Sequence, residues 1–137
     1  MNILITGASG FVGRHLMPAL QDQNHEVIAV DSNGFTGIWY LEEKFDYIIH
    51  LAVKTAAGGY CQTHSADQFL INSSINSDIF TYWSELQSQA KLITFGSSCG
   101  YDKNVIKVEE NYLKGEPEPG YEVYGNIKRN ILIGLKA

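Results

Sequence analysis

Long hydrophobic runs, clusters of basic residues and closely spaced cysteines are all missing from this sequence of 137 residues. The apolar runs are only a few residues long, and the first residues lack the charge and the long apolar core of a secretion signal. Ten lysines and arginines against fifteen aspartates and glutamates give a net charge of −5. Such a balance disfavours binding to nucleic acid or to anionic membranes through bulk charge. We therefore expect a cytoplasmic protein that binds neither.

Cysteine is scarce, which limits the kinds of site and scaffold that the chain can form. Cys61 and Cys99 lie far apart and have no metal-ligand spacing, so we expect neither a metal site nor a disulfide scaffold. Hydrophobic residues make up 45% of the chain and charged residues 18%, values typical of a folded protein. The length predicts one domain covering residues 1–137.

Glycine is concentrated near the start of the chain. Gly7, Gly10 and Gly13 lie three residues apart, between an apolar run at 2–6 and a helical pattern at 11–23. This order predicts a strand, a tight turn and a helix N-terminus, where backbone N–H groups and the helix dipole favour a pyrophosphate. The alternative is that these glycines only permit the turn.

An acidic residue follows the next apolar run. Residues 27–30 are apolar and end at Asp31, about 20 residues beyond the glycines, where a carboxylate can accept the two ribose hydroxyls of an adenosine. A carboxylate there would also repel a 2′-phosphate, which favours NAD over NADP, with NADP still possible. The alternative is an ordinary polar residue at the end of a strand.

Two further apolar runs and two long helical patterns complete the chain. Runs at 45–52 and 91–96 predict strands, the stretch 65–89 predicts the longest helix, and 122–135 predicts the last one. The longest helix has apolar residues at helical spacing: Ile71, Ile75, Ile79, Trp83 and Leu86. Strands that alternate with helices predict an α/β fold, a three-layer, Rossmann-like, doubly wound parallel sheet.

A tyrosine and a lysine four residues apart lie on the last helix. Tyr124 and Lys128 share one helix face, and a nearby cation favours the phenolate, so the pair suits proton transfer. Ser97, which follows the fourth strand, could hydrogen-bond a substrate oxygen while hydride passes to or from a nicotinamide. Alternatively, Tyr124 packs on the sheet beside a solvated lysine. Tyr40 and Lys44 have the same spacing, which we interpret as a chance surface pair.

These motifs together resemble the extended short-chain dehydrogenase/reductase family of nucleotide-sugar epimerases and dehydratases. Its branch of epimerase/reductases acting on GDP-linked 4-keto-6-deoxy sugars is the most similar. The resemblance is carried by 6–13, 46–52, Ser97 with Tyr101, and Tyr124 with Lys128. It implies that Ser97, Tyr124 and Lys128 are catalytic, and that Cys99 moves protons during epimerisation. A small buried packing residue is the alternative for Cys99. Asn72 matches an asparagine common in this helix of the family.

The chain also departs from the family's pattern. The family has an additional strand and helix where this chain has only residues 32–45, so we expect about four strands in the order 2-1-3-4, with strand 2 at an edge. The chain ends within the helix that carries Lys128. We therefore expect a truncated dinucleotide-binding domain that lacks the C-terminal substrate domain, with turnover by this chain alone in doubt.

Two functions are consistent with these patterns. The first is a nucleotide-sugar epimerase/reductase module that binds NAD or NADP, with a nucleotide sugar as substrate. The second is a non-catalytic dinucleotide-binding or dimerisation module. The resemblance implies a homodimer in which helices 65–89 and 122–135 pair, and Trp83, Phe69, Phe80, Ile127 and Ile131 could form that interface here. The cofactor-binding residues that we predict are Gly7, Ser9, Gly10, Phe11, Val12, Gly13, Asp31, Leu51, Ala52, Tyr124 and Lys128.

Overall fold

The computed structural model describes residues 1–31, 35–56 and 59–137, which fall into two compact units. The first unit holds Met1–Val53 with Ser77–Thr94, and the second holds Lys54–Asn76 with Phe95–Ala137. The longest helix, α3 (Ser65–Leu86), contributes residues to both. That the chain forms a single domain stays a prediction.

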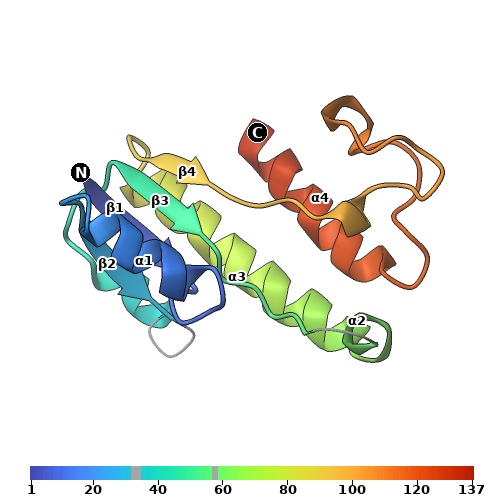
Figure 1. The fold of residues 1–137 in the computed structure, drawn as a ribbon, viewed down its shortest axis with the longest axis horizontal. Coiled ribbons are helices and arrows are strands. Elements are labelled where there is room, and N and C mark those ends of the chain that lie inside the picture. Colours follow the sequence, from blue (N-terminus) through green and yellow to red (C-terminus); the bar gives the residue numbers. More distant parts are fainter. Residues whose placement is uncertain (32–34, 57–58) are drawn as a thin grey trace. The chain divides into compact units, whose positions relative to one another are not determined.

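The first unit is built on a four-stranded, all-parallel sheet in the order β2-β1-β3-β4, which confirms the predicted order (Figure 1). In the register of the central strand, Leu4 lies opposite both Ile28 and Ile48. Since the chain enters β1, β3 and β4 from the same side, their carboxyl ends share one edge of the sheet. The strands are β1 (Asn2–Thr6), β2 (Glu26–Val30), β3 (Tyr47–His50) and β4 (Lys91–Ile93).

Helix α1 (Gly13–Gln21) covers one face of this sheet (Figure 1). Ile3, Ile5 and Ile49 are buried toward this helix because alternate strand residues point to the same face. The partly buried residues that pack against them include Leu16, Met17 and Leu20 of α1. A continuous apolar layer thus holds α1 on the strands that carry the glycine turn.

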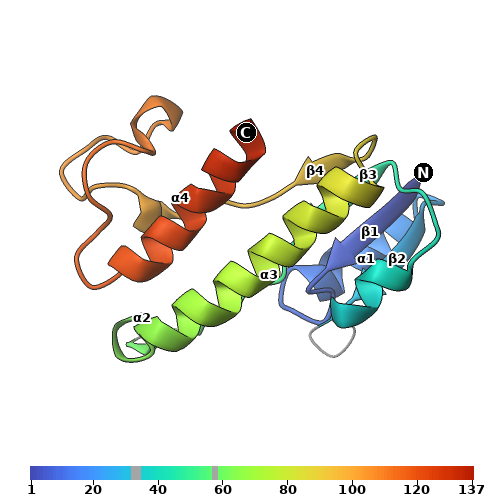
Figure 2. The same cartoon turned by 180° about the vertical axis from the view of Figure 1, so that it is seen from behind.

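The other face is covered by the end of α3 and by the 3-10 helix η1 (Phe35–Tyr40) (Figure 2). Leu4 and Ile48 point to this face and are fully buried. The covering elements bury their own side chains equally well: Ile38, Ile79 and Tyr82. Both faces of the sheet are therefore covered, as a parallel sheet requires.

The second unit contains mostly short elements around helix α4 (Glu122–Lys136). Ile127, Ile131 and Tyr112 form part of its buried apolar set. The other elements are α2 (Tyr60–Thr63), the first part of α3, η2 (Ser98–Gly100) and η3 (Glu109–Asn111). Three of these, α2, η2 and η3, are too short to show a period and were not predicted from the sequence.

The predicted apolar stripe of α3 is partly wrong. Ile71 and Leu86 are exposed, whereas Gln68 and Asn72 are buried. Asn72 can be buried because its amide pairs with the backbone of Lys54. Hydrophobicity alone therefore misplaced the buried face of this helix.

Several predicted elements are shorter in the structure. The strand expected at 45–52 pairs only over Tyr47–His50, and the one expected at 91–96 ends at Ile93. Apolar residues still follow the last paired residue, Leu51 after β3 and Phe95 after β4, so composition could not show where the ladder stops. No helix in the described parts of the chain is long and apolar enough to cross a membrane.

Candidate functional site

The glycine-rich segment after β1 forms an exposed turn at the carboxyl edge of the sheet. Gly7 has a φ of +71° and donates its N–H to the carbonyl of Val30 at 2.8 Å. The Gly10 N–H then closes the turn on the carbonyl of Gly7 at 3.0 Å. Gly10, Phe11 and Val12 are exposed, so side chains do not cover the bend.

Two of the glycines are required by close backbone packing. A Cβ on Gly7 would lie 2.7 Å from the Ala52 nitrogen, and a Cβ on Gly13 would lie 2.5 Å from the Ala8 carbonyl oxygen. Side-chain capping is absent at Val12, the residue before α1. The N–H groups of Arg14, His15 and Leu16 are bonded to the Gly10 and Val12 carbonyls, so the start of α1 offers an anion the N–H groups that precede Arg14 and the positive end of the helix dipole. This turn fits the pyrophosphate of a dinucleotide.

Asp31 faces the same turn from the end of β2. Its Oδ1 accepts the N–H of Ser9 at 2.9 Å. At the end of β3, the Leu51 N–H donates to the Thr6 carbonyl at 3.1 Å and the Ala52 N–H to Thr6 Oγ1 at 3.3 Å. One edge of the sheet thus brings together these predicted cofactor residues: Gly7, Ser9, Gly10, Phe11, Val12, Gly13, Asp31, Leu51 and Ala52.

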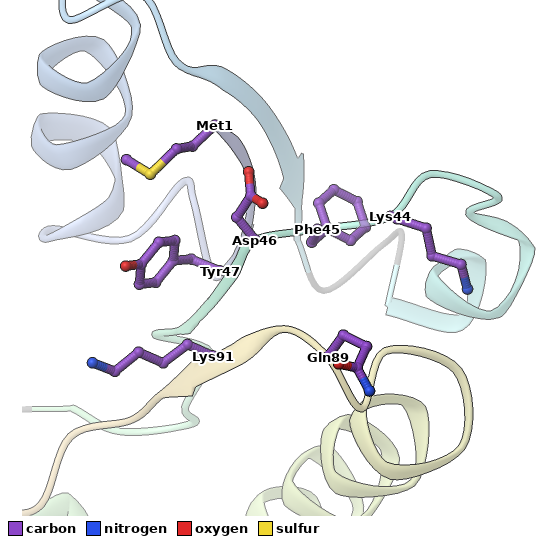
Figure 3. A pocket seen from close by; sticks show the side chains of 7 residues that line it. All are labelled: Met1, Lys44, Phe45, Asp46, Tyr47, Gln89 and Lys91. Atoms are coloured by element: carbon purple, nitrogen blue, oxygen red, sulfur yellow. The ribbon is translucent and has the colours of Figure 1, made fainter.

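A hollow of about 550 Å³ opens at the opposite, amino edge of the same unit (Figure 3). Two of its charged groups are engaged locally: Lys44 donates to the Leu86 carbonyl at 3.0 Å, and Asp46 accepts the Asn2 N–H at 2.8 Å. Ligands of parallel sheets bind at the carboxyl ends of the strands, so this hollow is not the predicted site. It is lined by Met1, Lys44, Phe45, Asp46, Tyr47, Gln89 and Lys91.

In the second unit, Ser97 is held at both its backbone and its side chain. Its N–H donates to the Tyr112 hydroxyl at 3.2 Å, and its own Oγ accepts the Cys99 N–H at 3.2 Å. A serine hydroxyl carries one proton and two lone pairs. Ser97 therefore retains its proton for donation to a substrate oxygen.

Tyr124 and Lys128 lie one turn apart on α4, as predicted. The Lys128 ammonium is 5.8 Å from the centroid of the Tyr124 ring and donates to the Phe95 carbonyl at 3.2 Å. A Cβ on Gly125 would lie 2.5 Å from the Cys99 carbonyl oxygen, so α4 abuts the turn that follows Ser97. The second unit thus brings together the four residues predicted as catalytic: Ser97, Cys99, Tyr124 and Lys128.

The protonation of this cluster differs from the expectation in one respect. Burial raises the pKa of the Tyr124 phenol, and a hydrogen bond with the Thr55 side chain only partly opposes this. Burial also lowers the pKa of Lys128. We expected Lys128, helped by the charge of an oxidised nicotinamide, to lower the pKa of Tyr124; in the chain by itself, desolvation of the phenolate is the larger effect.

Cys99 and Asn72 have different environments. Cys99 is a free, half-buried thiol, and its thiolate form would raise the pKa of Tyr124 further. It is therefore not sealed in a core. Asn72 is buried, accepts the Lys54 N–H at 2.7 Å and donates to the Lys54 carbonyl at 3.0 Å. This pairing fixes the backbone immediately before Thr55.

Three residues around this site were missed in the sequence: Thr55, Tyr112 and Arg129. Tyr112 packs so closely on the segment after β4 that a Cβ on Gly100 would lie 2.7 Å from its hydroxyl. For Tyr112, the one signal in the sequence was the pair of glycines at 96 and 100, on either side of Ser97, which indicates that another group packs closely on this segment. Thr55 and Arg129 carry no local pattern that distinguishes them from surface residues.

Comparison with known proteins agrees with this geometry. The family model for the NAD dependent epimerase/dehydratase family matches residues 3–132. The chain belongs to this family. The assignment fits the exposed glycine turn in the first unit and the tyrosine and lysine of α4 in the second.

Individual relatives of this epimerase-family chain are longer than it is. GDP-L-colitose synthase from Yersinia pseudotuberculosis is 29% identical over 138 residues, which cover 93% of this chain and 44% of the relative. A GDP-D-glycero-L-gluco-heptose synthase from Campylobacter jejuni, solved in the presence of NADPH, has a TM-score of 0.85 at 23% identity, covering 98% and 42%. A GDP-L-fucose synthetase from Naegleria fowleri has a TM-score of 0.80 at 19% identity, covering 96% and 42%. The chain thus spans less than half of each relative.

Proposed function

We propose that this chain is the dinucleotide-binding and proton-transfer part of a nucleotide-sugar epimerase or reductase. The observation that carries the proposal is the arrangement around α4. Lys128 and Tyr124 lie one turn apart, and Lys128 is hydrogen-bonded to the segment that presents Ser97. The glycine turn with Asp31 supports the binding of NAD or NADP.

A bound nicotinamide cofactor would supply hydride to the keto carbon of the sugar or, in the reverse direction, accept hydride from the carbon of the corresponding alcohol. The chain's own residues would bind and protonate the carbonyl oxygen of the sugar. The Ser97 hydroxyl hydrogen-bonds the carbonyl oxygen, and Tyr124 gives its proton to that oxygen as the alcohol forms. Because burial raises its pKa, Tyr124 is protonated at neutral pH, which suits reduction. In an epimerase, Cys99 would move the proton at the carbon beside the ketone.

A GDP-linked 4-keto sugar is the substrate class that we propose. The names of GDP-L-colitose synthase and of the heptose synthase both contain a GDP sugar. Since the chain spans less than half of those proteins, its whole activity is part of the proposal. Asp31 favours NAD over NADP, whereas the heptose synthase was solved with NADPH present, so both cofactors enter the test.

A homodimer through helices 65–89 and 122–135 is also proposed. In the second unit, the neighbouring residues Phe69 and Leu70 of α3 are 53% and 65% exposed, so they offer apolar surface for an interface. Ile127 and Ile131 are buried in the single chain, so the expectation that they form the interface is wrong. Light scattering of the wild type and of Phe69→Ser tests the dimer, which should dissociate in the variant.

The cofactor proposal is tested by titrating NADH and NADPH with the wild type, Asp31→Ala and Asp22→Ala. Asp22 follows α1 in the same unit and is exposed, so it controls for lost charge. We expect Asp31→Ala to bind NADH about tenfold more weakly, because hydrogen bonds to a charged group are worth about 1.5–3 kcal/mol. Failure of the wild type to bind either cofactor would refute this part of the proposal.

The catalytic proposal is tested with Tyr124→Phe and its matched control Tyr40→Phe. Tyr40 begins the other tyrosine–lysine pair of the sequence, and its side chain is 85% exposed. We expect Tyr124→Phe to lower the rate of 4-keto sugar reduction by at least about 10²-fold, the usual contribution of a general acid, while Tyr40→Phe retains it. Equal rates in the two variants would refute the proposed proton transfer from Tyr124. If the wild type binds the cofactor but does not reduce the sugar, the non-catalytic module is favoured.

A further inference from the structure

We propose that Arg129 is a positioning residue that fixes the segment from Phe95 to Gly100, and with it the Ser97 hydroxyl and the Cys99 thiol. The inference rests on the proposed function, which makes that hydroxyl and that thiol the reacting groups. Arg129 directly follows Lys128 in α4. It need not touch the substrate to act in this way.

The guanidinium of Arg129 is buried, and each of its three nitrogens donates one hydrogen bond to a main-chain oxygen. Only 8% of the residue is exposed. Nε donates to the Gly100 carbonyl at 2.6 Å, Nη1 to the Gly115 carbonyl at 2.7 Å, and Nη2 to the Lys114 carbonyl at 2.9 Å. Hydrogen bonds from a charged donor are short and strong, and the planar fork fixes their directions. The buried guanidinium therefore restrains the backbone at Gly100, Gly115 and Lys114.

Consecutive cations of α4 hold the two ends of the segment. Lys128 Nζ donates to the carbonyl of Phe95, and Arg129 Nε donates to the carbonyl of Gly100. Between these two points, Gly125 lets the Cys99 carbonyl approach α4 more closely than a side chain would allow. The segment is therefore anchored to the helix that carries Tyr124.

Arg129 also reaches the segment indirectly, through the stretch that contains Tyr112. The carbonyls that it binds at Lys114 and Gly115 belong to the turn after Tyr112, and the Tyr112 hydroxyl accepts the Ser97 N–H. Gly115 has a φ of +61°, so the guanidinium stabilises a turn that ordinary residues rarely adopt. A lysine at this position has one nitrogen in place of the three that Arg129 uses, so it lacks the planar fork that fixes these three directions.

The test compares Arg129→Met and Arg129→Lys with Ile131→Ala. Ile131 is buried two residues further along α4 and donates no side-chain hydrogen bond, so its truncation destabilises α4 without releasing the three carbonyls. The readout is the rate at which iodoacetamide alkylates Cys99, followed by mass spectrometry well below the unfolding temperature. Cys61, which is buried, is followed in the same samples.

We expect Arg129→Met to alkylate at Cys99 at least about tenfold faster than the wild type, because opening a segment held by buried hydrogen bonds then needs much less free energy. Arg129→Lys should lie between the two, and it provides the test if Arg129→Met does not fold. Ile131→Ala should stay close to the wild type. In an active preparation, Arg129→Lys should lower kcat and leave KM unchanged.

Unchanged alkylation at Cys99 in folded Arg129 variants would overturn the inference. Equal acceleration in Ile131→Ala, or parallel acceleration at Cys61, would also overturn it, because either result indicates general loosening. The proposed function fails separately: a wild type that binds neither NADH nor NADPH refutes that function, whereas the alkylation ratio does not depend on either cofactor.

Discussion

Gly13 allows the sharpest prediction about the glycine turn. A Cβ at this position would lie 2.5 Å from the Ala8 carbonyl oxygen, 2.6 Å from the Ala8 Cα and 2.6 Å from the Gly7 carbonyl oxygen. All three atoms are main chain, so no side-chain rotation can relieve the contact. Gly13→Ala must therefore displace the start of α1 from the turn.

Two opposing terms set the size of the effect. Alanine in a helix is favoured over glycine by about 1 kcal/mol, whereas overpacking of this kind costs about 1–3 kcal/mol. Because backbone cannot move aside as a side chain would, we take the upper part of that range and expect a net loss of about 1–2 kcal/mol. For a chain of this size this corresponds to a fall in Tm of about 5 °C.

The matched control is Gly37→Ala. Gly37 lies in η1 of the same unit, and nothing stands within 4 Å of a Cβ built on it. Urea unfolding followed by circular dichroism, with NADH titration of each variant, makes the comparison. We expect Gly13→Ala to be less stable than the wild type and to bind NADH more weakly, and Gly37→Ala to be at least as stable as the wild type and to bind NADH equally well. Equal stability and affinity in the two variants would refute the close-packed turn.

Two further predictions concern the second unit. Gln68 is buried, and its Oε1 has no hydrogen-bond donor among the described residues. Gln68→Met should therefore raise the free energy of unfolding by about 1 kcal/mol, and a lower urea midpoint would contradict this. Burial raises the pKa of Tyr124 above its usual value near 10, so the unfolded state loses that proton first, and stability falls as the pH rises above about 10. The urea midpoint of Tyr124→Phe should therefore fall less steeply with pH than that of the wild type between pH 9.5 and 11, a range around the ordinary phenol pKa of about 10. An equal fall in the two proteins would show that Tyr124 does not contribute to this pH dependence.

The sheet was predictable because its signals are local. The apolar runs of β1 and β2, the glycines between them and Asp31 at the end are contiguous in the sequence, so strand, turn and helix could be placed directly. The order of the strands was expected from the family resemblance, in which the short connection after β2 replaces an additional strand and helix, and the structure confirms it. The ends of β3 and β4 were not predictable, because pairing partners decide where a ladder stops.

The residues that surround the proposed catalytic groups were harder to predict from the sequence. Ser97, Tyr124 and Lys128 were found because their spacing is a recognisable motif. Arg129 looks like a solvated residue at a helix surface until Gly100 and Gly115 are folded against it. Thr55 is equally plain in the sequence, although its side chain hydrogen-bonds the phenol of Tyr124.

The sequence by itself determined the alternation of strands and helices, the open glycine turn and the identities of the groups proposed for chemistry. These depend on neighbouring residues, through backbone freedom and hydrophobic period. Only the tertiary structure decided the state of those groups. The raised pKa of Tyr124, the lowered pKa of Lys128 and the burial of Arg129 against three carbonyls all follow from desolvation and long-range contact. Such effects depend on which segments exclude water from one another, and that is fixed only when distant parts of the chain meet.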